Sequence, residues 1–105
     1  MDFIELKTTF EVEQEAKDMA ELLLDKKLVA CAQILEINSH YVWQNKRFVE
    51  HEYMIIMKSR ASLYPLLEST IKQNHSYEVA EIIATPIINL SQEYADWIKE
   101  NTIEI

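Results

Sequence analysis

Hydrophobic and polar positions alternate with a period of two along residues 3–9, a pattern typical of a strand with one buried face. From Glu11 onward the period becomes that of a helix, with one apolar stripe on a charged surface. The stripe comprises Val12, Ala16, Met19, Ala20, Leu23 and Leu24. Thr8 or Thr9 is expected to cap this helix, because a hydroxyl there can accept from a free backbone N–H. We expect a half-buried strand followed by a solvated amphipathic helix.

Two long apolar stretches, residues 28–43 and 47–58, predict a pair of strands joined around residues 44–46. Asn45 is expected to adopt the left-handed turn conformation, because asparagine tolerates it better than most residues. Strands this long extend beyond the core that one chain of 105 residues can build. The aromatic residues near the tip then need a covering surface, and we expect another subunit to supply it.

Helical spacing returns over residues 61–74, with Ser59 or Ser62 as the expected cap. Residues 75–88 end in an apolar run and predict a fourth strand. Ser91 is expected to cap a last short helix.

This order of elements is that of an α+β, ferredoxin-like fold (βαββαβ) with a long central hairpin and an added C-terminal helix. Right-handed crossovers would place both main helices on one face of a four-stranded antiparallel sheet. With 105 residues, 49% of them hydrophobic, the chain is long enough for one such domain and too short for two. We expect residues 1–105 to form a single domain.

Composition removes several classes of function. A formal charge of −8 argues against a nucleic-acid partner, and the absence of glycine excludes phosphate-binding loops and the nucleophile elbow. No serine or cysteine has an evident base beside it, so no enzyme class is indicated. The chain has no run of about 18 apolar residues that would span a membrane. Its N-terminus lacks a signal-peptide pattern, and its one cysteine cannot form an internal disulfide, so we expect a cytoplasmic protein.

The segment from His75 to Glu81 carries the candidate chemistry. On a strand, His75, Tyr77 and Glu81 would face one side and Glu78 the other. A histidine beside a carboxylate can bind a divalent copper or zinc ion, given a third ligand from elsewhere. His75, Glu81 and Glu78 are therefore the candidate metal ligands, and no other cofactor is required. The favoured alternative is a structural hydrogen bond between His75 and a carboxylate.

Other polar residues suggest packing rather than chemistry. Cys31 lies among small apolar residues and is expected to pack as a buried hydrophobe. Pairing around the hairpin turn places His40 roughly opposite Glu50 and His51. A histidine–carboxylate contact across the hairpin is therefore expected, with a two-histidine metal site as the weaker alternative.

Several short motifs occur along the chain in the same order as in a known protein family. These motifs are Thr8-Thr9, Leu28-Val-Ala-Cys-Ala32, Tyr41-Val-Trp43, the segment His75-Ser-Tyr-Glu-Val-Ala-Glu-Ile82 and Tyr94-Ala-Asp-Trp-Ile98. Together they resemble the CutA family of divalent-cation tolerance proteins over nearly the whole chain. The resemblance implies a homotrimer similar to the PII signalling proteins and a cytoplasmic role in tolerance of copper and other divalent ions. It implies no established catalytic reaction.

The resemblance also shows where this chain departs from its family. The copper ligands proposed for some bacterial members are a cysteine at the end of the first strand and two adjacent histidines before the fourth. Here Lys7 stands at the cysteine position and Asn74-His75 replaces the pair. A soft thiolate is thus replaced by an ammonium group, which cannot bind copper(I).

Two hypotheses follow. The first is a non-enzymatic, trimeric divalent-cation tolerance protein that binds copper or zinc weakly through His75 and nearby acids. The alternative is a PII-like regulatory or scaffold module, which binds a small molecule or protein in inter-subunit clefts lined by residues such as Tyr41, Trp43 and Lys46.

Overall fold

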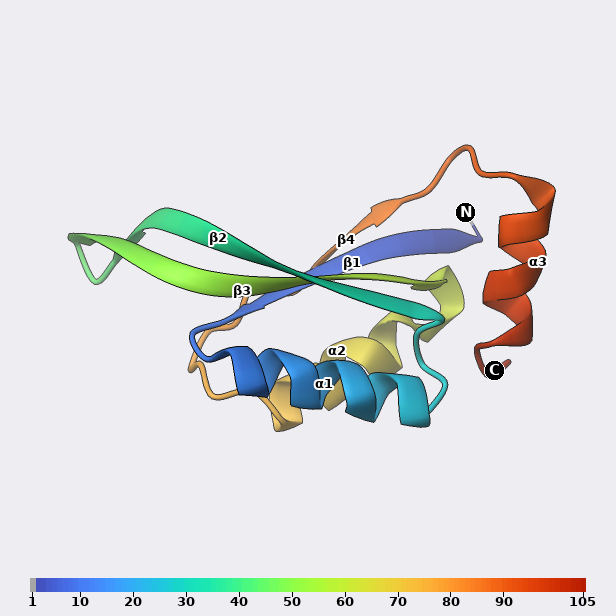
Figure 1. The fold of residues 1–105 in the computed structure, drawn as a ribbon, viewed down its shortest axis with the longest axis horizontal. Helices are drawn as coiled ribbons and strands as arrows, with labels where there is room; N and C mark the ends of the chain where they lie inside the picture. Colours follow the sequence, from blue (N-terminus) through green and yellow to red (C-terminus); the bar gives the residue numbers. More distant parts are fainter. Residues whose placement is uncertain (1) are drawn as a thin grey trace.

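The computed structural model describes residues 2–105, which form a four-stranded antiparallel sheet with two helices packed on one face (Figure 1). The strands are β1 (Phe3–Phe10), β2 (Cys31–Trp43), β3 (Lys46–Arg60) and β4 (Ile83–Pro86). The helices are α1 (Glu13–Asp25), α2 (Tyr64–Gln73), preceded by a short 3-10 turn (Ala61–Leu63), and α3 (Gln92–Glu100). The strands lie in the order β2-β3-β1-β4, which confirms the predicted α+β, ferredoxin-like arrangement.

The core lies between the sheet and the helices α1 and α2. Side chains of β1 and β3 alternate across the sheet, so Leu6, Ile55 and Met57 point to the helices and are fully buried. The helix α3 instead covers one end of the sheet, where Ala95 and Ile98 pack with Phe3. None of the helices within residues 2–105 is long and apolar enough to cross a membrane.

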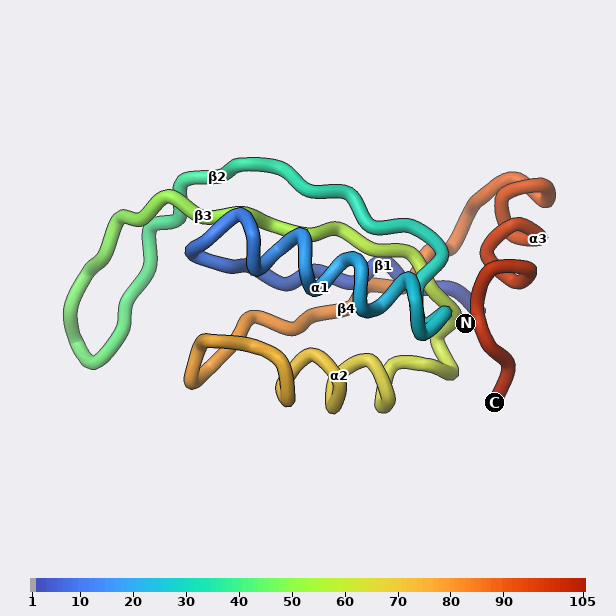
Figure 2. The backbone as a smooth tube through the Cα atoms, turned by 60° about the horizontal axis from the view of Figure 1, so that its bottom comes forward, coloured from blue at the N-terminus to red at the C-terminus, as the bar shows by residue number. Residues whose placement is uncertain are grey.

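The hairpin of β2 and β3 extends well beyond the helices (Figure 2). Its two turn residues, Gln44 and Asn45, both adopt positive φ, at 50° and 64°, which confirms the prediction for Asn45. Positive φ at both positions is the geometry of the two-residue turn whose twist matches that of paired strands. The turn therefore fixes the register of the hairpin, with Trp43 opposite Lys46.

The predicted caps of the two main helices were wrong. Thr8 and Thr9 belong to β1, because its pairing with β3 continues as far as Phe10. The helix α1 begins after Val12, and α2 begins after the 3-10 turn, in both cases without a capping side chain. The prediction for α3 is confirmed, because Ser91 Oγ accepts from the Tyr94 N–H at 3.1 Å.

The fourth strand is much shorter than predicted: it spans Ile83–Pro86, whereas residues 75–82 form bends and irregular backbone. The cause lies in the backbone acceptors of β1. The Phe3 carbonyl accepts from the Ile87 N–H across the β4 side of β1. The Thr9 carbonyl, further along the same side, accepts from the His75 side chain instead. The ladder between β1 and β4 therefore ends at Lys7.

Candidate functional site

The imidazole of His75 is held in place by stacking on the Phe10 ring and by two hydrogen bonds. Its imidazole stacks on Phe10 with ring centroids 4.1 Å apart. Its Nε2 lies 2.8 Å from the Thr9 carbonyl oxygen, and its Nδ1 lies 3.1 Å from the Tyr77 backbone nitrogen. A carbonyl can only accept and an N–H can only donate, so Nε2 carries the proton and Nδ1 accepts. His75 is therefore a neutral imidazole of defined tautomer.

Burial lowers the pKa of His75, although the Thr9 carbonyl and the carboxylates of Glu15 and Glu52 act in the opposite direction. Both ring nitrogens are already hydrogen-bonded, so a metal ion at His75 would have to displace either the Tyr77 amide or the Thr9 carbonyl. In this conformation His75 fixes the path of residues 75–77.

Tyr77 connects that segment to the hairpin. Its hydroxyl donates to Glu52 Oε2 at 2.6 Å, which is a short hydrogen bond to a charged acceptor. The Glu52 side chain lies on β3 and is only 7% exposed. Burial, followed by the Glu52 carboxylate, raises the pKa of the Tyr77 hydroxyl well above its ordinary value, so Tyr77 remains a donor.

A cleft of about 700 Å³ opens between this segment and the hairpin. Its walls come from residues 39–43 of β2, from residues 76–81, and from Thr9 and Glu52. Glu78 and Glu81 both line it, so the expectation that they face opposite sides of a strand was wrong. That expectation assumed a period of two, which residues 75–82 do not have. The structure thus brings Glu78 and Glu81 to one cleft with Glu52, and His75 lies at the start of the segment that forms its wall.

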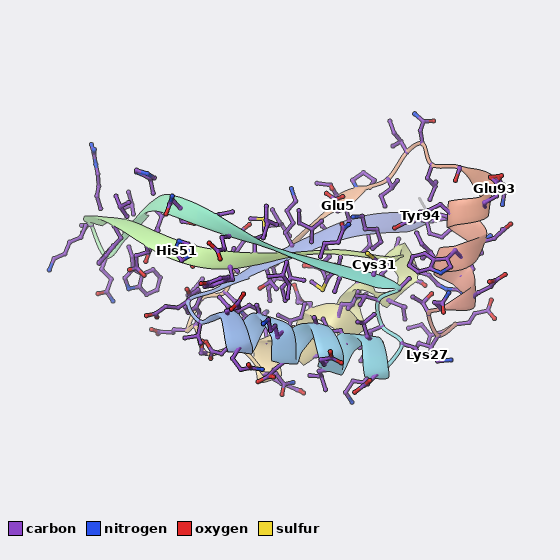
Figure 3. All side chains as sticks on the ribbon, in the orientation of Figure 1. Glu5, Lys27, Cys31, His51, Glu93 and Tyr94 are labelled. Carbon is purple, nitrogen blue, oxygen red and sulfur yellow. The ribbon has the colours of Figure 1, made fainter. Side chains whose placement is uncertain are left out.

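The hairpin histidines occupy different places from those predicted. His40 lies opposite Val49 rather than Glu50, because the register differs by one residue from the expected pairing. The expected histidine–carboxylate contact is made instead by His51, whose Nε2 lies 3.6 Å from Glu36 Oε2. Figure 3 shows His51 on the projecting part of the hairpin.

Cys31 lies at the other end of the sheet, near α3 and Tyr94 (Figure 3). Its side chain is half-buried at the start of β2, whereas its apolar neighbours in the sequence had suggested full burial in the core. Burial, with a smaller effect of the Cys31 sulfur, raises the pKa of the Tyr94 hydroxyl.

The placement of the potential metal ligands limits how a single chain can bind a metal ion. Residues 2–105 contain no group of three or more histidine, cysteine, aspartate or glutamate side chains placed to hold a metal ion. Lys7 Nζ lies 4.0 Å from Glu5 Oε1, so Lys7 contributes a cation to β1 rather than a metal ligand. Within residues 2–105 the chain therefore has no preformed, tight metal centre.

Comparison with known proteins decides the family. The family model described as CutA1 divalent ion tolerance protein matches residues 4–101. The chain belongs to the CutA family. This confirms the resemblance seen in the sequence, and it places the chain among proteins named for tolerance of divalent ions rather than for a catalysed reaction.

Relatives and solved structures agree with that assignment. The divalent-cation tolerance protein CutA of Thermus thermophilus is 35% identical over 91 residues, which are 86% of this chain and 88% of that protein. The crystal structure of CutA1 from Oryza sativa superimposes with a TM-score of 0.96 at 34% identity, covering 100% of this chain and 97% of that one. A structure from Archaeoglobus fulgidus, described as a periplasmic CutA, gives a TM-score of 0.92 at 33% identity and covers 94% and 97% of the two chains. Some relatives are longer: the match spans 51% of the human protein CutA.

Sequence reasoning missed Glu52 and its partnership with Tyr77. The sequence does contain an indication of its role. Glu52 is two and four residues before Met54 and Ile56, so on a strand its side chain is expected to point to the same face as these apolar side chains. An acid at such a position needs a specific partner. The partner lies 25 residues away, and the periodicity of the sequence carries no information about that distance.

Proposed function

We propose that this CutA-family chain is a non-enzymatic divalent-cation tolerance protein that acts in the cytoplasm as a homotrimer of single 1–105 domains. The observation that carries the proposal is the family match over residues 4–101. An acidic cleft in the same protomer supports it, because carboxylates attract divalent cations. Neither nucleic acid nor a membrane is a partner in this proposal, consistent with the formal charge of −8.

The exposed surface of the hairpin supports the homotrimer. Large apolar side chains are exposed along it; Val42 and Val49, for example, keep 68% and 66% of their surfaces accessible. The strand β2 is also a long edge strand with unpaired backbone groups on its outer side. Covering both features in a subunit interface would remove apolar surface from water and satisfy those groups.

Light scattering tests the assembly. We expect the mass of a trimer that persists on dilution. We also expect Val49→Glu to reduce that mass, because it places a charge in the proposed interface, whereas Leu24→Glu on the exposed side of α1 should leave it unchanged. A wild-type protein that is monomeric at micromolar concentration would overturn the homotrimer.

Divalent cations are proposed to bind weakly through Glu78 and Glu81, and His75 would join them as a third ligand only after a rearrangement of residues 75–81, because the three side chains are not placed together to hold a metal ion. The two carboxylates share a cleft, and residues 2–105 place neither of them in an ion pair. Weak binding is expected because His75 must release a hydrogen bond before it can coordinate a metal. Copper(II) and zinc(II) suit such a mixed nitrogen and oxygen donor set.

Isothermal titration calorimetry of metal-free protein with copper(II) and zinc(II) tests this assignment. A double variant, Glu78→Gln with Glu81→Gln, should lose most of the binding heat, and His75→Ala should lose part of it. Glu21→Gln, an exposed position on α1, removes one charge away from the cleft and serves as the control. Heats that are equal for all four proteins would remove these residues as ligands.

The second candidate function is a PII-like regulatory or scaffold module that binds a small molecule or a protein in the clefts of the trimer. The cleft of about 700 Å³ within one chain supports it, because its walls include the hairpin and its volume is that of pockets that hold small organic ligands. Tyr41 and Trp43 line the cleft, and Lys46 lies opposite Trp43 in the hairpin. A thermal-shift screen against a panel of metabolites tests it, and no shift with any compound would count against it.

A further inference from the structure

The helix α3 packs apart from the main core. Its buried side chains, Ala95 and Ile98, form a small apolar cluster with Phe3, whereas α1 and α2 pack on the sheet in a larger one. Irregular backbone over residues 87–91 joins α3 to β4. The helix lies at the opposite end of the sheet from the projecting hairpin, whose surface is assigned to the homotrimer (Figure 1). A unit attached in this way can open while the rest of the fold stays intact.

Arg60, the last residue of β3, holds the end of α3 by three contacts. Its Nη2 donates to the Lys99 carbonyl oxygen at 2.6 Å, and its Nε donates to Thr102 Oγ1 at 2.8 Å. Its Nη1 lies 3.9 Å from Glu104 Oε1. Hydrogen bonds from a charged donor are stronger than those between neutral groups, and a cation is also favoured at the C-terminal end of a helix. One guanidinium group therefore carries a large part of the polar attachment of α3.

The seam between α3 and the sheet is incompletely packed. A pocket of about 260 Å³ lies there, lined by Arg60, by Lys99 of α3 and by Asp2, Phe3 and Ser62. The Lys99 ammonium group lies over the Phe3 ring, 5.8 Å from its centroid. A polar pocket of this size admits water, which competes with the protein acceptors for the Arg60 donors. Breaking the Arg60 contacts therefore costs less than it would in a closely packed interface.

One further contact holds the tail that follows α3. The Ile103 N–H donates to the Lys27 carbonyl oxygen at 2.9 Å, and the Ile103 side chain, partly buried, packs on the main core. Ile103 and Arg60 thus hold the same short segment, residues 99–104, from two sides. Once these contacts break, α3 is held mainly by the small cluster around Ile98, which buries far less apolar area than the main core.

We propose that residues 92–104, α3 and its tail, form a strap that opens as one unit while the sheet, α1 and α2 stay folded. Arg60 is the clasp that keeps the strap closed. Opening separates Ala95 and Ile98 from Phe3, which is 6% exposed in the closed form, and so presents an apolar surface at the end of the sheet. This equilibrium depends on neither the homotrimer nor the metal ligands proposed above, so it is tested independently of both.

Amide hydrogen exchange of the full chain, in its own assembly state, measures the opening. Overlapping peptides from α3 report the strap, and peptides from α1 report the main core. We expect the amides of residues 95–101 to share one opening free energy that is lower than that of α1. It should change little with low concentrations of urea, because opening the strap exposes little surface. Equal protection of α3 and α1 would overturn the proposal. Protection that falls gradually towards residue 101 would also count against it, because that is the pattern of fraying.

Two substitutions distinguish a strap from a single cooperative unit. Arg60→Gln should raise the exchange rates of the α3 amides by about tenfold to a hundredfold, the effect of losing hydrogen bonds to a charged group. Ile71→Val alters a fully buried position of the main core on α2. It should raise the α1 rates by about twofold to tenfold and leave the α3 rates unchanged, because Ile71 stays packed when the strap opens. If Ile71→Val accelerates α3 and α1 equally, the chain unfolds as one unit and the proposal fails.

Two more variants test the clasp itself. Lys17→Gln removes a positive charge from the exposed side of α1 and should leave the α3 rates unchanged. Thr102→Val removes one acceptor of Arg60 without altering β3, and it should accelerate α3 by a smaller factor than Arg60→Gln. Circular dichroism and light scattering confirm that each variant keeps its fold and its assembly. Unchanged α3 rates in both Arg60→Gln and Thr102→Val would reject Arg60 as the clasp and with it the proposal.

Discussion

Replacement of His75 by phenylalanine isolates the two hydrogen bonds that hold the start of the cleft wall. Phenylalanine keeps a flat ring on Phe10, which lies 4.1 Å from the imidazole, but it can neither donate to Thr9 nor accept from Tyr77. A typical intramolecular hydrogen bond contributes about 0.5–1.5 kcal/mol net, so the pair corresponds to about 1–3 kcal/mol. Both bonds are partly buried, so water recovers some of that loss. We expect the free energy of unfolding to fall by about 1–2 kcal/mol.

Urea denaturation followed by circular dichroism measures this change, with every variant at the same protein concentration because an oligomer unfolds in a concentration-dependent way. Glu21→Phe is the control, since Glu21 is exposed on α1 and lies outside the hairpin, and its replacement should cost less than about 0.5 kcal/mol. A double-mutant cycle of His75→Phe with Tyr77→Phe should show coupling, because the two side chains position the same segment. A loss below about 0.5 kcal/mol for His75→Phe would refute the role assigned to His75.

Three further predictions follow from single positions. Because burial lowers the pKa of His75 below its ordinary 6.5, the unfolded chain binds its proton more readily, so stability should decrease as the pH falls from about 6.5 towards the pKa of the folded state. Chemical denaturation of wild type and His75→Phe across this range checks it, and the same slope in both proteins would contradict it. Thr8→Val should raise stability by about 1 kcal/mol, because Thr8 Oγ1 is buried without a hydrogen-bond partner, and a lower melting temperature would contradict this. Gln44→Asn should stabilise the hairpin by a few tenths of a kcal/mol, because Gln44 adopts φ 50°, and an unchanged or lower urea midpoint would count against that reasoning.

Local patterns predicted most of the fold. Residues 3–9 and the stripe of α1 show their periods clearly, and asparagine at the hairpin tip indicates the turn without knowledge of the rest of the chain. Right-handed connections then leave few topologies for such an order of elements. These features depend on contacts between residues near each other in sequence, or on general rules of chain connection.

The candidate site could be predicted only in part, because its geometry depends on long-range contacts. The Thr9 carbonyl and the His75 ring are 66 residues apart, yet their hydrogen bond ends β4 and removes the strand parity on which the ligand arrangement was predicted. Glu52 reaches Tyr77 across 25 residues. Their residue types were enough to identify His75, Glu78 and Glu81 as candidate metal ligands. Their grouping around a cleft depends on how the hairpin and residues 75–82 meet in space.

The central place of β1 in the sheet has a consequence for the order of folding. The strand β1 pairs with β3 from Phe3 opposite Arg60 and with β4 from Ile4 opposite Pro86, so both of its partners follow it far along the chain. The hairpin of β2 and β3 closes over two residues and can form early, whereas β1 must wait for long loops to close. Until then, the apolar side chains of β1 remain unprotected. In a chain of this topology, Glu5 and Lys7 on the opposite face of β1 carry the charges that discourage its pairing with other nascent chains.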